Sequence, residues 1–210
     1  PLYSERIARK DDQMVARLRA AGALFIGKTN TPEFGLGSNT FNPVYGKTKN
    51  PYDLTRTCGG SSGGAAVALA TRMLSISDGS DMMGSLRNPA AWNNVYGLRP
   101  TWGLVPPEPS GEIFLSQLST LGPMARSPKD LALLLDVQAN HFDNKSYVLQ
   151  SKSFWNFTAQ PLMKGIKIGW LGDWGGTLTF EDELLDLAQN ALNEMSSLGA
   201  IIHDLKAPFA

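Results

Sequence analysis

The chain has 210 residues, 42% hydrophobic and 18% charged, a composition typical of a folded globular protein and not of a disordered tail. Nineteen basic residues balance nineteen acidic ones without a block of like charge, which argues against a nucleic acid or a membrane surface recruited by net charge. The one cysteine, Cys58, excludes an intrachain disulfide. No leader and no membrane-length apolar run is recognisable, so we expect a cytoplasmic protein without a membrane partner.

Helix-like and strand-like patterns alternate along the chain. The first is an amphipathic helix over residues 10–20, closed by Gly22 and followed by a short buried strand over 23–26. Residues 29–57 are rich in Asn, Pro and Gly, and predict a long ordered loop of the kind that carries function. The remaining predicted elements are a helix over 65–70, a strand over 73–77, a helix from 89, a strand near 95, a helix over 127–137, a strand over 166–171, a helix over 181–198 and a strand from 201.

This alternation predicts an α/β fold, in which helices cover both faces of a mixed β-sheet. The Gly-poor segment 151–157 is the expected boundary between a core over residues 1–150 and a continuation of the same domain over 151–210. The continuation would supply a covering helix and a strand. We expect the domain to be incomplete at both ends.

Three short patterns have a weaker physical basis. Residues 22–29 fit the P-loop expression, but the residues between its glycines read as an apolar strand, whereas a phosphate cradle needs a flexible Gly-rich loop. Ser61 and Ser62 each lie in a G-x-S-x-G pattern, but a poor strand precedes them, and the base of a histidine triad would be His141 or His203, each among ordinary surface residues. Neither histidine has carboxylates at ligand spacing, so we predict no metal.

Two Gly/Ser loops, over residues 59–64 and 78–88, each lead into a predicted helix. The first backbone N–H groups of a helix are unpaired and can bind a developing oxyanion. One such loop is commonly only a tight turn, but two in one α/β chain favour a catalytic site. Ser85 follows a glycine and several N–H groups, an arrangement that suits acyl transfer.

Five segments in a fixed order resemble the amidase-signature family. They are GKTNTPEF at 27–34, GGSSGG at 59–64, GSDMMGSLRNPA at 79–90, GLRPT at 97–101 and GPMARS at 122–127. The resemblance spans residues 10–137, and such an ordered string of motifs is highly specific. It implies an amidase-signature-like α/β fold and a Ser–cis-Ser–Lys triad in place of a histidine triad.

Carried over motif by motif, the resemblance assigns the site residues. Ser85 is the nucleophile, and Ser61 is the bridging serine of an unusual cis peptide bond. The family's lysine precedes this serine by more residues than the chain contains before Ser61, so the lysine is expected upstream of Pro1. The chain is therefore expected to be a segment of a longer protein. The oxyanion hole would consist of the N–H groups of Met82, Met83, Gly84 and Ser85, with Ser62, Asp81 and Arg87 in supporting roles.

The implied activity is amide hydrolysis through a seryl acyl-enzyme, which needs no cofactor. The expected partner is a small-molecule amide, with no direct nucleic-acid contact. If the chain is a fragment of a larger sheet, the edges exposed where the sheet is truncated would favour a homo-oligomer. One alternative is a glutaminase like that of the glutamyl-tRNA(Gln) amidotransferases, which works with other subunits. Another is a catalytically incompetent fragment or scaffold.

Two features of the second loop bear on specificity. The family usually has glycine where Met83 stands, so the torsions of this oxyanion loop are expected to differ. Met82, Met83 and Trp92 indicate an apolar surface near the nucleophile, which favours an aliphatic or aromatic amide over a charged one.

Overall fold

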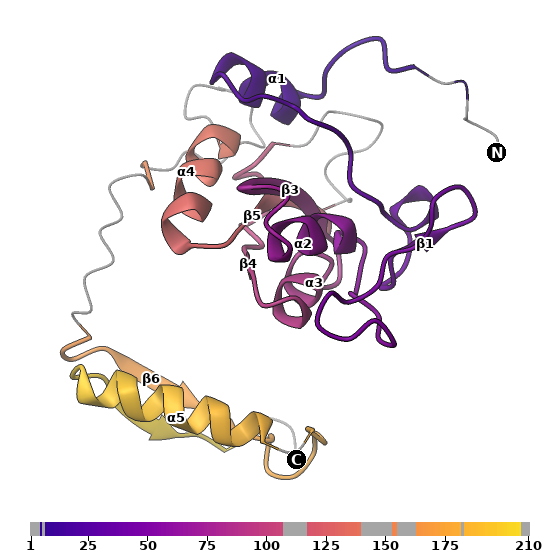
Figure 1. The fold of residues 1–210 in the computed structure, drawn as a ribbon. Helices are drawn as coiled ribbons and strands as arrows, with labels where there is room; N and C mark the ends of the chain where they lie inside the picture. The colour runs from indigo at the N-terminus through magenta and orange to yellow at the C-terminus, as the bar shows by residue number, and fades with distance from the viewer. Residues whose placement is uncertain are drawn as a thin grey trace. The chain divides into compact units, whose positions relative to one another are not determined.

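The computed structural model describes residues 5, 7–106, 117–139, 153–154, 163–181 and 183–206. The chain divides into two compact units, Pro1–Phe157 and Thr158–Ala210. Helices and strands alternate within each of them (Figure 1). The predicted α/β class is confirmed.

The first unit is built around a three-stranded antiparallel sheet in the order β3-β5-β4, with a separate β1-β2 hairpin. Its elements are α1 (Gln13–Ala20), the 3₁₀ turn η1 (Glu33–Gly35), β1 (Phe41–Asn42), β2 (Gly46–Lys47), α2 (Gly63–Ala70), β3 (Ile76–Asp81), α3 (Arg87–Trp92), β4 (Tyr96–Gly97), β5 (Thr120–Ala125) and α4 (Pro128–Ala139).

Helices cover both faces of this sheet. Successive side chains of a strand point to opposite faces, so Leu121 and Met124 of β5 lie on different sides. Met124 packs with α2 and α3, and Leu121 packs with α1 and α4; these helix pairs are also seen together in Figure 1. The buried residues of the two clusters are Ala65, Ala66, Leu69, Leu86, Ala90 and Met124 on one side, and Met14, Leu18, Val105, Leu134 and Leu135 on the other.

Capping residues mark the start of α1 and of α4 and the end of α1. Asp12 caps α1 by accepting a hydrogen bond from the Met14 N–H (3.0 Å), and Gly22 ends the helix with φ +86°. Ser127 caps α4 by accepting from the Asp130 N–H (3.1 Å), while its hydroxyl donates to the Asp130 carboxylate (2.7 Å). The predicted helices over 10–20 and 127–137 are therefore confirmed.

The predicted buried strand over residues 23–26 is wrong. This segment is extended but pairs with no described strand, and Leu24 and Ile26 are 91% and 75% exposed. A four-residue apolar run does not by itself identify a strand, because no period can be read over so short a length. The strand predicted over 73–77 begins later, since β3 starts at Ile76 and runs through the Gly/Ser segment to Asp81.

The central strand β5 contains Pro123, and a proline at this position argues against a strand when only the sequence is considered. Proline cannot donate to a strand ladder and is rare in central strands. The Pro123 carbonyl accepts from the Leu98 N–H (3.1 Å), just beyond the end of β4 at Gly97. Because the N–H and C=O of a strand residue point to the same side, the absent N–H would face this irregular segment and not a continuing strand. The sheet therefore tolerates a proline in its middle strand.

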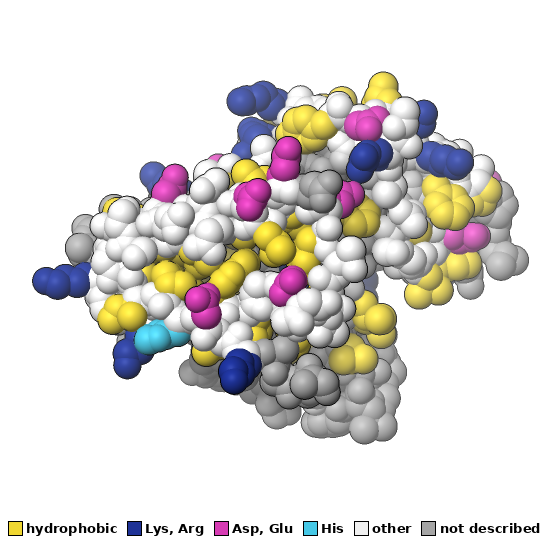
Figure 2. Space-filling view, turned by 90° about the horizontal axis from the view of Figure 1, so that it is seen from below, with side chains coloured by type: hydrophobic (Ala, Val, Ile, Leu, Met, Phe, Trp, Pro, Cys, Tyr) yellow, Lys and Arg dark blue, Asp and Glu magenta, His cyan; other side chains and the backbone are white. Residues whose placement is uncertain are grey.

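The second unit is a parallel strand pair joined by one helix. β6 (Lys167–Trp170) pairs with β7 (Ile201–Asp204), and α5 (Leu184–Ser197) connects them, so the predicted strand over 166–171, helix over 181–198 and strand from 201 are confirmed. Hydrophobic side chains are visible on the face shown in Figure 2, and in this unit Leu184, Leu187 and Ile201 are exposed.

Candidate active site

The first Gly/Ser loop packs directly against a neighbouring stretch of backbone. Its peptide bond between Gly60 and Ser61 is cis. A Cβ atom on Gly60 would lie 2.8 Å from the backbone nitrogen of Asn39, and one on Gly64 would lie 2.4 Å from that of Asn30. Both distances are too short for real atoms, so glycine is required on either side of the serines.

One buried hydroxyl bridges the two ends of this loop. Thr40 is 2% exposed; its Oγ1 donates to the Gly59 carbonyl (2.8 Å) and accepts from the Gly63 N–H (3.1 Å). Cys58 is fully buried beside the loop, its Sγ donates to the Thr48 carbonyl (3.1 Å), and burial raises the pKa of its thiol. The long loop that precedes the serines therefore packs against the Gly/Ser loop and fixes its position.

Ser62 joins the first Gly/Ser loop to the second. Its backbone N–H donates to the Ser85 carbonyl (3.2 Å). Its hydroxyl donates to the Ser80 carbonyl (3.3 Å) and accepts from the Ser80 N–H (3.2 Å). A Cβ atom on Gly79 would lie 2.6 Å from the Ser62 Oγ, so β3 can approach this closely only with glycine there. The structure thus brings Ser61, Ser62 and Ser85 into one region.

Asp81 ends β3 with a fully buried carboxylate. It accepts hydrogen bonds from the N–H groups of Gly84 (2.7 Å) and Leu86 (3.2 Å). The Arg87 guanidinium donates to it from Nε (3.0 Å) and Nη2 (3.1 Å), and Nη1 of Arg99 lies 3.1 Å from Oδ1. The carboxylate therefore holds the chain on both sides of Ser85.

These donors hold the pKa of Asp81 well below its usual range. Burial acts in the opposite direction because it disfavours the charged form, but Arg87 and the N–H groups of Gly84, Leu86 and Arg87 outweigh it.

Arg99 had no predicted role, although it stands in the GLRPT motif. It also donates from Nη2 to the Leu118 carbonyl (2.7 Å), and only the fold brings these residues together.

The loop between Asp81 and Ser85 places two methionine side chains in solvent. Met82 is 52% and Met83 85% exposed, and Ser85 is half-buried. The N–H groups of Met82, Met83 and Ser85 donate to no described residue, whereas that of Gly84 donates to Asp81. Three of the four predicted oxyanion donors are therefore available in this structure, and the fourth is engaged.

The two candidate catalytic hydroxyls are not hydrogen-bonded to each other. Ser61 is buried, with 6% of its surface exposed, and within the described ranges its hydroxyl bonds to no other residue. The Ser85 hydroxyl likewise has no partner among the described residues. Both side chains are therefore unengaged by the residues that the structure describes.

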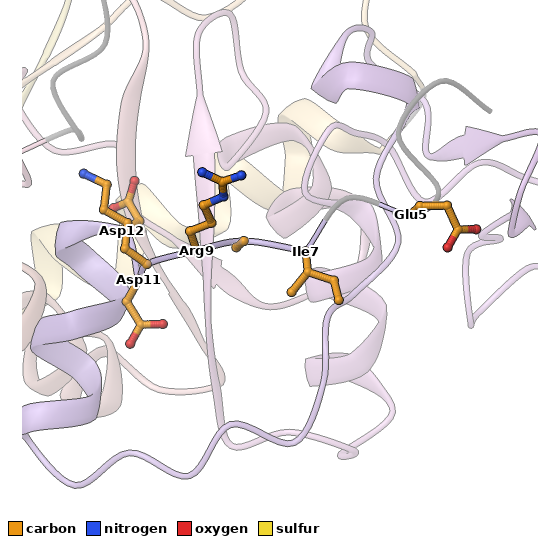
Figure 3. A pocket seen from close by; sticks show the side chains of 7 residues that line it. Glu5, Ile7, Arg9, Asp11 and Asp12 are labelled. Atoms are coloured by element: carbon orange, nitrogen blue, oxygen red, sulfur yellow. The ribbon is translucent and has the colours of Figure 1, made fainter.

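A hollow in the structure lies along the N-terminal segment and not at these loops (Figure 3). Figure 3 shows that its lining comes from one stretch of chain, and no predicted site residue belongs to it.

Among the described residues no cluster of three or more His, Cys, Asp or Glu could hold a metal. No helix in the described part of the chain is long and apolar enough to cross a membrane. Of the two histidines, His141 lies outside the described residues. The hollow described above and shown in Figure 3 is lined by Glu5, Ile7, Ala8, Arg9, Lys10, Asp11 and Asp12.

Comparison with known proteins connects this serine and glycine geometry to a family. The Amidase family model matches residues 1–209. The chain belongs to the amidase family. The amidase-signature resemblance of the motifs is thereby confirmed.

Relatives within the amidase family differ in what they are named for. A glutamyl-tRNA(Gln) amidotransferase subunit of Alkaliphilus metalliredigens (strain QYMF) is 38% identical over 99% of this chain. A bacterial aryl acylamidase of the amidase-signature family has a similar structure, with a TM-score of 0.85 and 31% identity over 95% of this chain and 41% of its own. The corresponding glutamyl-tRNA(Gln) amidotransferase subunit of Thermotoga maritima has a TM-score of 0.82 and 29% identity over 95% of this chain and 44% of its own. The chain spans 42% of the length of the first of these relatives.

Proposed function

We propose that the protein hydrolyses a carboxylic amide with Ser85 as nucleophile and Ser61 as the serine that relays its proton. The observation that supports this most directly is the hydrogen bond from the Ser62 N–H to the Ser85 carbonyl (3.2 Å). It fixes the two Gly/Ser loops side by side, and neither candidate hydroxyl is engaged by another described residue. Family membership supports amide chemistry in general.

The proposed reaction has two halves. A neutral lysine, which the family resemblance puts upstream of Pro1, takes the Ser61 proton as Ser61 takes that of Ser85. The Ser85 oxygen attacks the amide carbon, and the C–N bond breaks as the relay returns a proton to the leaving nitrogen. Water then hydrolyses the resulting ester. Lysine can act as the base only when burial and neighbouring charges lower its pKa from about 10.4 toward the working pH.

The developing oxyanion would be stabilised by backbone N–H groups of the second loop. Those of Met82, Met83 and Ser85 are unengaged by the described residues, and they sit immediately before or at the nucleophile. Removing one such donor from an acyl-transfer enzyme costs about 100- to 1000-fold in rate. The buried Asp81 carboxylate supports this loop by binding Gly84 and Leu86 on either side of Ser85.

The test is labelling by a fluorophosphonate probe of the protein expressed from its own gene, with whatever residues flank 1–210. The parent protein should label, and Ser85→Ala should not. Ser61→Ala should label more than 10-fold more slowly, since the relay is lost. Ser77→Ala on β3 is the matched control and should label like the parent. Equal labelling of Ser85→Ala and the parent would exclude Ser85 as the nucleophile.

We further propose that the amide is neutral and apolar at its acyl group. The support is the exposed pair Met82 and Met83 next to the nucleophile. A comparison of kcat/KM for hexanamide, succinamate and glutamine tests the substrate class. Hexanamide should be turned over fastest, and a clear preference for succinamate or glutamine would contradict an apolar acyl site.

A second candidate function is release of ammonia from glutamine as part of an amidotransferase. It is favoured by the 38% identity to a protein named as a glutamyl-tRNA(Gln) amidotransferase subunit. Glutaminase activity together with co-purification of further subunits would establish it. The remaining alternative, a non-catalytic scaffold, predicts a folded protein that neither labels with the probe nor hydrolyses any of the three amides.

A further inference from the structure

We propose that Thr40 is a positioning residue for the relay serine, holding the main chain on both sides of Ser61. This inference rests on the proposed function, because it assigns Thr40 a part in the chemistry of Ser61. Thr40 comes from the long loop before the Gly/Ser motif, and no motif assigns it a role. The inference comes from the contacts and the burial of Thr40.

The Thr40 hydroxyl bonds to the loop before and after Ser61. Oγ1 donates to the carbonyl of Gly59 (2.8 Å) and accepts from the N–H of Gly63 (3.1 Å). The Thr40 backbone N–H also donates to the Gly59 carbonyl (3.1 Å). Ser61 therefore lies at the centre of a five-residue segment whose ends are tied to one residue.

Groups outside α2 accept from its first backbone N–H groups. Ser62 is the N-cap residue of α2, where a serine hydroxyl usually accepts from a first-turn N–H. Here the Ser62 hydroxyl makes no capping bond, since it is bonded to Ser80 of β3. Thr40 accepts from the N–H of Gly63, the first residue of the helix, and the Asn30 carbonyl accepts from that of Gly64 (3.2 Å). Ser62 is thereby free to join the two Gly/Ser loops.

The Thr40 hydroxyl is buried and is the acceptor for the Gly63 N–H. Thr40 is 2% exposed, so water has no access to restore the two bonds. A Cβ atom on Gly63 would lie 2.2 Å from the Thr40 Oγ1, so the segments that carry Thr40 and Gly63 are in direct contact. Replacing the hydroxyl with a methyl group would leave the Gly63 N–H without an acceptor beside Ser61. The Gly59 carbonyl would keep the Thr40 N–H (3.1 Å) and the Cys58 thiol (3.4 Å) as donors.

The direction of the Ser61 hydroxyl depends on the backbone that carries it. Within the described residues no side chain bonds to that hydroxyl. The position of this hydroxyl relative to Ser85 depends on the loop backbone, which Thr40 ties at both ends. Misplacement of a catalytic group by about 1 Å can lower a rate by about 100-fold.

The test compares an amide with an ester of the same acid in Thr40→Val and Thr40→Ser. Ammonia leaves hexanamide only with a proton from the relay, whereas nitrophenolate leaves 4-nitrophenyl hexanoate without one. Thr40→Val should therefore lose about 100-fold in kcat on hexanamide but about 10-fold or less on the ester, with KM changed little. Thr40→Ser keeps the hydroxyl and should stay within about 3-fold of the parent on both substrates.

A variant that is only less stable gives a different result. Leu135→Ala removes buried side-chain volume between α1 and α4 and should lower the unfolding midpoint while leaving the ratio of amide to ester rates unchanged. An unchanged ratio in Thr40→Val, or a Thr40→Ser as impaired as Thr40→Val, would overturn the positioning role. If Ser85→Ala keeps the amide activity, the proposed function itself fails, which separates the two outcomes.

Discussion

Replacing Asp81 with asparagine should destabilise the protein although the side chain keeps its size. The Asp81 carboxylate is fully buried and accepts from two backbone N–H groups as well as from Arg87 and Arg99. Asparagine retains one acceptor oxygen, but its NH₂ group would face donors instead of accepting from them. The two arginines would also lose their counter-charge.

The structure sets the size of this effect. Breaking a buried ion pair by removing one charge costs about 3–5 kcal/mol. The Arg87 side chain is 55% exposed and that of Arg99 26%, so solvent screens part of the loss and the lower end, about 3 kcal/mol, applies to Asp81→Asn. Arg87→Met is the matched comparison and should cost only about 1 kcal/mol, because Arg99 and the backbone donors remain.

The assay is urea unfolding of the intact protein between pH 7 and pH 3. The pKa of Asp81 is lowered in the folded state, so its contribution to stability is present above the unfolded pKa of about 3.9 and is lost as the pH falls through the folded pKa. The gap between the parent and Asp81→Asn should be constant near neutral pH and narrow below about pH 4. A gap under about 0.5 kcal/mol at pH 7 would refute the role of the carboxylate.

Three further outcomes test individual contacts. Gly84→Ala and Gly37→Ala introduce a Cβ at similar φ values of +115° and +111°, but only at Gly84 does it collide with a neighbouring side chain, at 2.7 Å. Amide hydrolysis should therefore fall about 100-fold in Gly84→Ala and stay near the parent rate in Gly37→Ala, and equal rates would contradict this. Cys58 should not react with a thiol-specific disulfide reagent at pH 8 until urea unfolds the protein, because it is fully buried and its pKa is raised; rapid labelling of the native state would contradict its burial. Arg126→Met should cost about 2 kcal/mol in thermal unfolding, since Arg126 donates to the Leu69 carbonyl (3.1 Å) in the last turn of α2, and an unchanged midpoint would show that this bond adds nothing.

Sequence reasoning was most successful where local physics decides the structure. Ser127 and the apolar period after it mark α4, and Gly22 marks the end of α1, because caps and periodicity act within a few residues. It failed where distant partners decide. Residues 23–26 look like a strand but pair with none in the described chain, and β5 is concealed by Pro123.

The candidate site shows the same division. The motifs predict Ser61 and Ser85, and the structure brings their loops together. Thr40 and Arg99 were not predicted, because each acts on residues about twenty positions away that only the fold brings near. A lone threonine in a polar loop carries no pattern that distinguishes it from its neighbours. Buried polar partners of this kind can be recognised only from a structure.

The close packing of the first Gly/Ser loop indicates where the protein can be redesigned. A Cβ atom added to Gly60, Gly63 or Gly64 would lie 2.2–2.8 Å from an existing atom, so none of these three positions accepts a side chain. Met82 and Met83 are 52% and 85% exposed and could be exchanged without disturbing the core. A library randomised at these two positions would test whether their side chains set the proposed preference for an apolar amide.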